Sequence, residues 1–146
     1  MAVTGVSHIP VGVRDMEKSL VFWRDFMGMT ISGDTGDRFK ERRSVFLRWN
    51  PEKTRDSVFM SLSAAREGEP AAPATGLGQL GINHISFWVD DLDAYVERAK
   101  ALNINVRMGP ETYGRPYGDL EHGEAIGTMM VIDPDGVAVQ IEEWRE

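Results

Sequence analysis

The chain has 146 residues, of which 42% are hydrophobic and 27% charged, and its formal net charge is −7. This length suits one globular domain, whereas half of it, about 73 residues, would be marginal alone. The acidic balance argues against a nucleic-acid partner, because phosphate-binding proteins gain affinity from net positive charge. Cysteine is absent, which excludes disulfides and thiolate metal sites. With no signal segment and no long apolar run, we expect a cytoplasmic protein that does not contact a membrane.

Two stretches of the chain share one pattern. In His8–Met16 and His84–Leu92, the residues His, Ile, Val and Asp recur in the same register. A duplicated module with a His at an equivalent point in each copy can bring two imidazoles together across a pseudo-twofold axis. The repeat therefore predicts that His8 and His84 bind one metal ion.

The first half of the chain is expected to form a strand, a helix and three further strands. In residues 3–13, alternation puts His8 on the face opposite Val11 and Val13. Asp15 then has the position of a helix N-cap, and Gly28 that of a left-handed stop. The apolar stripe of this helix is Met16, Leu20, Trp23 and Met27, and the three strands are expected at 29–32, 44–49 and 57–62.

The second half repeats this order. Asp91 is expected to cap a helix that ends near Asn103, with Leu92, Val96 and Ala99 as its buried stripe. Strands are predicted at 82–89, 104–108, 125–132 and 137–144, the last two joined by a tight turn at 133–136. The composition of 63–79 is that of a surface linker. The sequence thus predicts one domain, 1–146, made of module 1–62, linker 63–79 and module 80–146.

Four motifs together indicate a family: the strand with His8, the capped helix with Phe22-Trp23-Arg24-Asp25-Phe26-Met27-Gly28-Met29, the second His strand ending in Val89-Asp90-Asp91-Leu92, and the turn Asp133-Pro134-Asp135-Gly136. Over nearly the whole chain they resemble the vicinal oxygen chelate superfamily, which includes glyoxalase I, extradiol dioxygenases, fosfomycin-resistance enzymes and metal-free bleomycin-binding proteins. The resemblance implies an α+β fold of two βαβββ modules, with curved mixed sheets around a cavity and usually within a homodimer.

The resemblance also implies a ligand set. His8 and His84 match the first-strand ligand positions of the two modules. The last-strand ligand of the family is commonly a Glu four residues after the turn glycine, and here that position is Gln140. An amide oxygen can coordinate a metal but brings no charge. Glu142 lies on the same face of the strand, about 6 to 7 Å further along, and is the alternative third ligand. The matching strand of the first module, 58–62, offers no donor.

Two His and one oxygen donor approach the arrangement that leaves open positions on non-haem iron. We therefore expect Fe²⁺ or Mn²⁺ and slightly favour dioxygenase chemistry on a substrate with vicinal oxygens. Zn²⁺, Ni²⁺ or Co²⁺ would suit proton transfer by a lyase or isomerase. The alternative is a metal-free sequestering or resistance protein that binds an aromatic small molecule, and the uncharged Gln140 favours it.

Further residues are candidates for substrate binding and proton transfer. Trp88 and Ser86 share the His84 face, and Trp144 shares that of Gln140, so these three are predicted to line a cavity for a small, aromatic substrate. Core filling or a dimer contact is an equal alternative for each Trp. Segment 109–124 reads as a long loop over the site. Its Tyr113, Tyr117 and His122 are candidate acid/base groups, with a solvated loop as the alternative.

Overall fold

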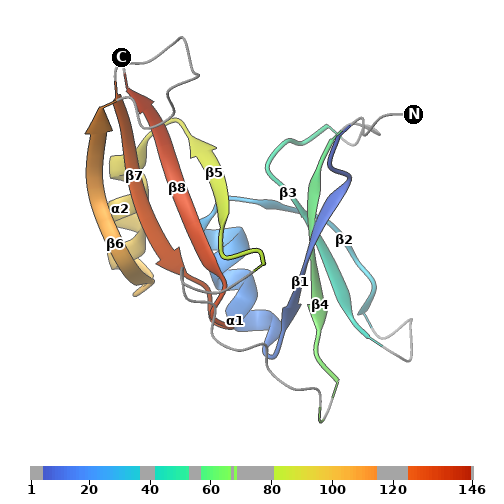
Figure 1. Cartoon of the computed structure of the whole chain (residues 1–146). Helices are drawn as coiled ribbons and strands as arrows, with labels where there is room; N and C mark the ends of the chain where they lie inside the picture. The colour runs from blue at the N-terminus through green and yellow to red at the C-terminus, as the bar shows by residue number, and fades with distance from the viewer. Residues whose placement is uncertain are drawn as a thin grey trace. The chain divides into compact units, whose positions relative to one another are not determined.

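The structure is a computed structural model that describes residues 5–36, 42–52, 57–66, 68, 81–114 and 125–145. It divides into two compact units, Met1–Ala71 and Ala72–Glu146. Each unit has the order strand, helix and three strands, so the predicted α+β fold of two βαβββ modules is confirmed (Figure 1). The first unit contains β1 (His8–Val13), α1 (Met16–Leu20), a π-helical segment (Val21–Phe26), β2 (Thr30–Asp34), β3 (Ser44–Arg48) and β4 (Phe59–Ala64). The second contains β5 (Ile85–Val89), α2 (Leu92–Ala101), β6 (Asn105–Gly114), β7 (Ala125–Ile132) and β8 (Ala138–Arg145).

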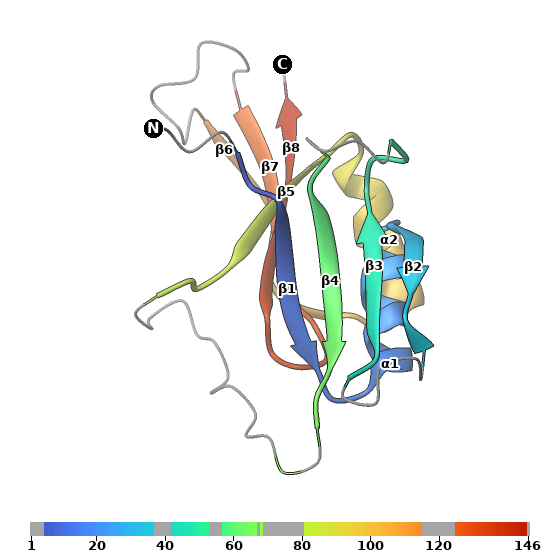
Figure 2. The same cartoon turned by 90° about the vertical axis from the view of Figure 1, so that its right-hand side faces the viewer.

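The sheet of the first unit has the strand order β1-β4-β3-β2 and is seen face-on in Figure 2. β1 runs parallel to β4, while β4, β3 and β2 are antiparallel neighbours. The register pairs His8 with Phe59 on β4 and Thr30 on β2 with Arg48 on β3. Residues from distant parts of the sequence are thereby placed in one row across the sheet.

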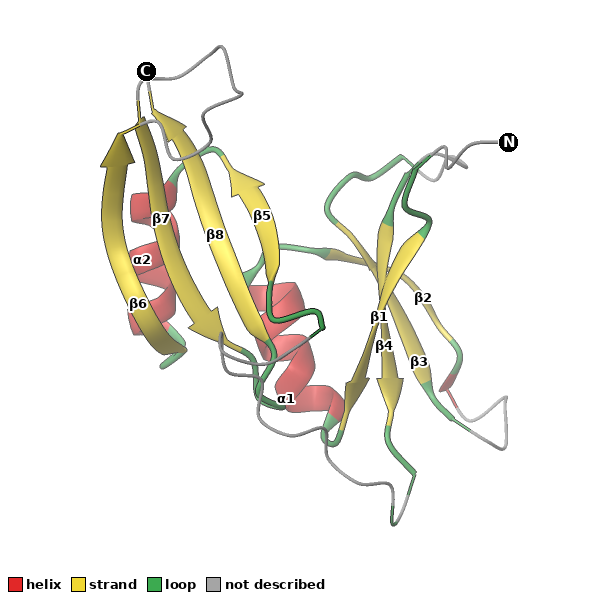
Figure 3. Cartoon of the chain, in the orientation of Figure 1, coloured by secondary structure: helices red, strands yellow, loops and turns green. Residues whose placement is uncertain are grey.

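The sheet of the second unit repeats this plan with the order β5-β8-β7-β6. β5 is parallel to β8, and its register pairs Ser86 with Gln140 and Trp88 with Glu142. On the other side of β8, Glu142 pairs with Thr128 of β7. Helix α2 lies across the back of this sheet in the view of Figure 3 and contacts β6, β7 and β8.

Each sheet has one apolar face that packs with its own helix. In the first unit the buried side chains are Val11, Val13, Val45, Leu47, Met60 and Leu62, together with Phe22, Trp23 and Phe26 of the helical region. In the second unit they are Leu92 and Ala99 of α2 with Met129, Val131, Val139 and Ile141. The predicted core position of Trp23 is confirmed. The alternate residues form what we call the polar face of each sheet, namely His8, Phe46, Arg48, Phe59 and Ser61 in the first unit and Ser86, Trp88, Thr128, Gln140 and Glu142 in the second.

The helix of the first unit differs from the continuous α-helix expected from the sequence. Asp15 caps it as predicted, its carboxylate accepting from the Lys18 N–H at 3.2 Å, and Gly28 ends it with φ 74°. Between them α1 has only five residues and continues as the π-helical segment, where the Met27 N–H donates to the Phe22 carbonyl at 2.9 Å. The wider π turn brings Phe22, Trp23 and Phe26 together into the core, each at most 1% exposed.

Strand β6 also differs from expectation. The sequence placed its end at Met108, yet the strand continues through Gly114 with register shifts near Met108. β6 is an edge strand, and an edge tolerates glycine, proline and bulges because only one side of the strand is hydrogen-bonded. Tyr113 is therefore a strand residue, while Tyr117 and His122 lie outside the described residues.

Other local predictions agree with the structure. The turn at 133–136 forms: the Asp133 carboxylate accepts from the N–H groups of Asp135 and Val137, at 2.9 and 2.8 Å, and Gly136 has φ 95°. Asp91 caps α2 by accepting from the Ala94 N–H at 2.9 Å. Within the described ranges, no helix is both long and apolar enough to cross a membrane.

Candidate functional site

His8 lies at the start of β1 on the polar face of the first sheet. Its ring stacks on Phe59 of β4, with centroids 5.2 Å apart and planes inclined by 13°. Its Nδ1 is 2.8 Å from the hydroxyl of Ser7, the residue before it. Stacking covers one surface of the imidazole, while the residue as a whole is exposed.

His84 directly precedes β5 in the second unit, and its immediate surroundings parallel those of His8. Its Nδ1 is 2.5 Å from the amide oxygen of Asn83, again the preceding residue. An amide oxygen accepts, so this contact is made when Nδ1 of His84 carries a proton. A neutral imidazole with its proton on Nδ1 can ligate a metal through Nε2, with Nδ1 oriented by an outer hydrogen bond.

The two oxygen donors predicted on β8 lie on one face and contact each other. The Gln140 amide nitrogen donates to the Thr128 hydroxyl at 3.0 Å and to Glu142 Oε1 at 3.2 Å. The Ser86 hydroxyl donates to Glu142 Oε2 at 2.5 Å. Glu142 is 4% exposed and Thr128 is 1% exposed, whereas Gln140 is half-buried and Ser86 exposed, so this polar cluster reaches from the interior to the surface. Both oxygens of Glu142 accept within the cluster, whereas Gln140 uses its nitrogen and keeps its oxygen as the acceptor end.

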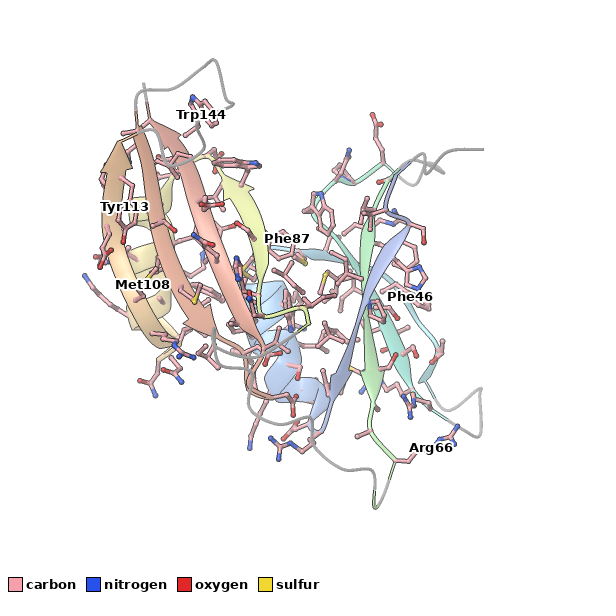
Figure 4. The ribbon with its side chains drawn as sticks, in the orientation of Figure 1. Phe46, Arg66, Phe87, Met108, Tyr113 and Trp144 are labelled. Carbon is pink, nitrogen blue, oxygen red and sulfur yellow. The ribbon has the colours of Figure 1, made fainter. Side chains whose placement is uncertain are left out.

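The aromatic residues predicted near this cluster form a pair. Trp88 on β5 and Trp144 on β8 have ring centroids 5.5 Å apart, inclined by 59°. Trp88 is 55% exposed, so it is not a core residue of the second unit. Figure 4 shows Trp144 near the end of β8, at the top of the view, with Met108 and Tyr113 on β6. The pair supplies an aromatic surface beside Ser86 and Glu142.

Tyr113 is the one predicted acid/base residue that falls within the described part of the chain. Its hydroxyl donates to the carboxylate of Glu111, two residues earlier on β6. This hydrogen bond, with the negative charge of Glu111, raises the pKa of Tyr113 above its ordinary value. At neutral pH Tyr113 is thus a protonated hydrogen-bond donor.

Sequence reasoning missed three residues that the strand pairing brings to the predicted site residues. Thr128 holds the Gln140 amide, Phe59 stacks on His8, and the Arg48 guanidinium lies 4.9 Å from the centroid of the Phe59 ring. Alternation alone assigned each predicted residue to a face. The cross-strand neighbours follow only from the register, which no local pattern in this sequence encodes.

The types of donor atom in these residues indicate which metal ions they could bind. Among the residues that the structure describes, no group of three or more His, Asp or Glu side chains is close enough to hold a metal. Each unit nevertheless carries one imidazole, and the second unit adds an amide oxygen next to a buried carboxylate. Imidazole nitrogens with amide or carboxylate oxygens suit Mn²⁺, Fe²⁺ or Zn²⁺, so the residues fit such an ion.

Known proteins are similar to this chain over nearly its whole length, in sequence or in structure. The protein YaeR of Escherichia coli (strain K12) is 23% identical over 141 residues, which span 94% of this chain and 95% of YaeR. A glyoxalase/dioxygenase from Nostoc punctiforme superposes with a TM-score of 0.73 at 21% identity, covering 98% of this chain and 92% of that one. The fosfomycin resistance protein FosX from Listeria monocytogenes, in complex with Mn(II) and sulfate ion, gives 0.63 at 19% identity, covering 97% and 93%.

A family description also matches the sequence directly. The model of the Glyoxalase/Bleomycin resistance protein/Dioxygenase superfamily matches residues 5–141. This span includes both His strands, both capped helices and the turn before β8. The match confirms the resemblance seen in the motifs, and the chain belongs to the Glyoxalase/Bleomycin resistance protein/Dioxygenase superfamily.

Proposed function

We propose that the protein is a metal-dependent enzyme that binds a small substrate with two neighbouring oxygens at a divalent metal ion, with His8, His84 and Gln140 as protein ligands. The observation that carries the proposal is the matched environment of the two imidazoles. In each module the His stands at the same repeat position, and its Nδ1 bonds the side-chain oxygen of the residue before it, Ser7 or Asn83. In the proposed site these contacts would orient both rings, leaving Nε2 of each to coordinate the metal.

The hydrogen bonds within the polar cluster favour Gln140 over Glu142 as the third ligand. Glu142 already accepts at both oxygens, from Ser86 and Gln140. A metal at Glu142 would share oxygens that already accept from Ser86 and Gln140, whereas Gln140 can offer its oxygen while its nitrogen stays bonded to Thr128. Glu142 then acts as a positioning residue that holds the Gln140 amide and supplies negative charge beside the cation.

A chelated divalent ion would supply charge stabilisation for developing oxyanions or, as Fe²⁺ or Mn²⁺, an electron for oxygen chemistry. Mn(II) is present in the structure of Listeria FosX. We favour Mn²⁺ or Fe²⁺ and slightly favour dioxygenase chemistry, because three neutral ligands would leave positions for a bidentate substrate and O₂. A lyase or isomerase using Zn²⁺, Ni²⁺ or Co²⁺ is the other enzymatic form of the proposal.

The chain's own residues would bind the substrate and move protons. The Trp88–Trp144 pair offers a surface for a flat, aromatic substrate, and Ser86 lies beside it. Tyr113 can donate its proton to a developing oxyanion, with Glu111 ready to take part in the exchange. His122 and Tyr117 remain proposed acid/base groups from the sequence.

Metal analysis tests the proposal most directly. Protein purified without an affinity tag should contain about one transition metal ion per chain by plasma mass spectrometry. His8→Ala and His84→Ala should each lower that content at least tenfold, because a lost imidazole removes one of three ligands. His122→Ala is the matched control and should keep the metal. Metal retained by the His8→Ala, His84→Ala double variant would refute the proposed site.

A metal-free sequestering protein is the second candidate, and two observations favour it. The carboxylate common at the last-strand position of the family is replaced by an amide, and the aromatic pair has an exposed Trp88. Such a protein would quench its tryptophan fluorescence on binding an aromatic compound after chelator treatment. Binding that instead requires added metal supports the enzyme.

A further inference from the structure

An arginine on the polar face of the first sheet lacks the carboxylate partner that other arginines of this chain have. Arg24, Arg43 and Arg145 each bond an acidic side chain at 2.8 Å or less. The contacts found for Arg48 in the described structure are of another kind. Its Nη1 donates to the Ser57 carbonyl at 3.0 Å, and its Cζ lies 4.9 Å from the Phe59 ring centroid. Its full positive charge is therefore not neutralised by a neighbouring anion within the described residues.

Two buried polar atoms at this point have no hydrogen-bond partner. They are Nε of Arg48 and the hydroxyl oxygen of Ser57, the only such side-chain atoms found among the described residues. A buried polar group without a partner destabilises the folded state, so native proteins keep few of them, and each needs an explanation such as a functional role or an ion that it binds. Because Nη1 is anchored, the edge formed by Nε and Nη2 is the one left to bind.

Arg48 stands in the same row of the sheet as His8. His8 pairs with Phe59 across β1 and β4, and Phe59 lies between the imidazole and the guanidinium, in contact with both. Strands lie about 4.8 Å apart, so His8 on β1 and Arg48 on β3, two strands along, are about 10 Å apart at their backbones. A small substrate can span this distance. Phe46 packs edge-on against Phe59 at 5.7 Å and helps to fix the ring in place.

We propose that Arg48 binds an anionic group of the substrate, either a carboxylate or a phosphoryl group. The substrate would then be a small molecule that carries such an oxyanion. The Nε–Nη2 edge of a guanidinium matches two oxygens of such a group through parallel, charge-assisted hydrogen bonds. The inference rests on the proposed function, because it places this anion in the same row of the sheet as His8, the proposed metal ligand. In a chain of net charge −7, an arginine held without a carboxylate partner gives the site a local attraction for anions.

The test measures binding of two simple probes, benzoate and inorganic phosphate, to chelator-treated protein by calorimetry at low ionic strength. Arg48→Gln should weaken the better-bound probe about tenfold or more, the usual consequence of losing charged hydrogen bonds. Arg107→Gln, which removes a charge from an exposed position on β6, is the matched control and should leave the affinity unchanged. Benzamide, which is neutral, should show no dependence on Arg48.

The two probes identify the anion, and metal content separates the two proposals. Stronger binding of benzoate indicates a carboxylate substrate, and stronger binding of phosphate a phosphoryl one. The inference is overturned if neither probe binds, or if the Arg48→Gln and parent proteins bind the probes with equal affinity. If the parent protein takes up no metal but binds a probe through Arg48, the enzymatic proposal fails and the anion site stands. Arg48→Gln should keep the metal content of the parent, since Arg48 is not a ligand.

Discussion

At the scale of single residues, the Gln140–Glu142 contact determines how the polar cluster responds to charge. Gln140→Glu would place two carboxylates side by side where an amide now donates to Glu142 at 3.2 Å. A bound cation relieves that repulsion, so we expect metal affinity to rise about tenfold and the metal-free variant to unfold at a lower temperature than the parent. Chelator competition measures the affinity, and thermal denaturation measures the stability.

Glu142→Gln is the companion experiment. If Glu142 is a positioning residue, this change should lower metal affinity only a fewfold, because the amide can still accept from Ser86. A loss comparable to that of His84→Ala would make Glu142 the ligand. An affinity that responds to neither substitution would mean that β8 provides no ligand, and would favour the sequestering protein.

A second residue-scale prediction concerns the ion pair of Asp34 and Arg43. The hydrogen bond from Arg43, 2.8 Å from the carboxylate, lowers the pKa of Asp34, with help from the Gly36 N–H. A depressed folded-state pKa adds stability above the unfolded value near 3.9, and this is lost as pH falls through the folded pKa. Since both side chains are about one-third exposed, 33% and 37%, solvent screening keeps the effect to about 0.5 kcal/mol.

Urea denaturation as a function of pH checks this expectation. Asp34→Asn should be less stable than the parent at pH 7 by about that amount and should equal it at a low pH, below the folded-state pKa of Asp34. When both proteins also carry Arg43→Gln, the difference between their unfolding free energies should depend much less on pH. A deficit of the same size at both pH values would show that Asp34 acts through packing and not through charge.

The residues of the candidate site were predictable to an unequal degree. His8, His84 and Gln140 could be assigned to faces because a strand alternates with period two and the repeat fixes equivalent positions. Thr128 and Arg48 could not, because their link to the site depends on which strands pair and in what register. That information is distributed over the whole sheet.

At the scale of elements, the two helix caps are equivalent by sequence and by structure. Asp15 accepts from the Lys18 N–H at 3.2 Å and Asp91 from the Ala94 N–H at 2.9 Å. Replacing either by Ala should cost about 1 kcal/mol of unfolding free energy, the usual value of a lost cap. Asp90→Ala, one residue before the second cap, is the matched control and should change stability by less than about 0.5 kcal/mol. Equal losses for Asp90→Ala and Asp91→Ala in urea denaturation would contradict the capping role.

Elements with strong local signals were predicted well, and the departures have physical causes. β7 matches its predicted range of 125–132, and both caps and the turn at 133–136 form as expected. The π-helical segment was not predictable, because the spacing of Leu20, Trp23 and Met27 also fits an α-helix. The wider turn is seen only in the structure, where it accompanies the burial of both Phe22 and Phe26. The extension of β6 through Gly109 and Pro110 depends on its place at the sheet edge, which the sequence does not show.

At the scale of the whole molecule, the two modules repeat a backbone plan but not a chemistry. The strand orders β1-β4-β3-β2 and β5-β8-β7-β6 are equivalent, each with a parallel pair at the start. Around its His, the polar face of the first sheet carries Phe59 and Arg48, whereas that of the second carries oxygen donors and tryptophans. Under the two proposals, the first sheet would bind an anionic group beside His8 and the second would add the oxygen ligand, so the repeat alone points to the two His but not to the substrate.

The last prediction is that the protein is a homodimer whose association does not depend on Trp88. Several large apolar side chains are exposed in the single chain, including Ile82 at 82% and Trp49 at 45%, and burying apolar surface of this kind favours a symmetric dimer. Sedimentation velocity should give twice the chain mass across the micromolar range. Trp88→Ser should keep that mass and lose affinity for aromatic compounds, because we assign Trp88 to the substrate side of the sheet. A shift of this variant toward monomer would instead place Trp88 in the interface, and a monomeric parent protein would refute the dimer.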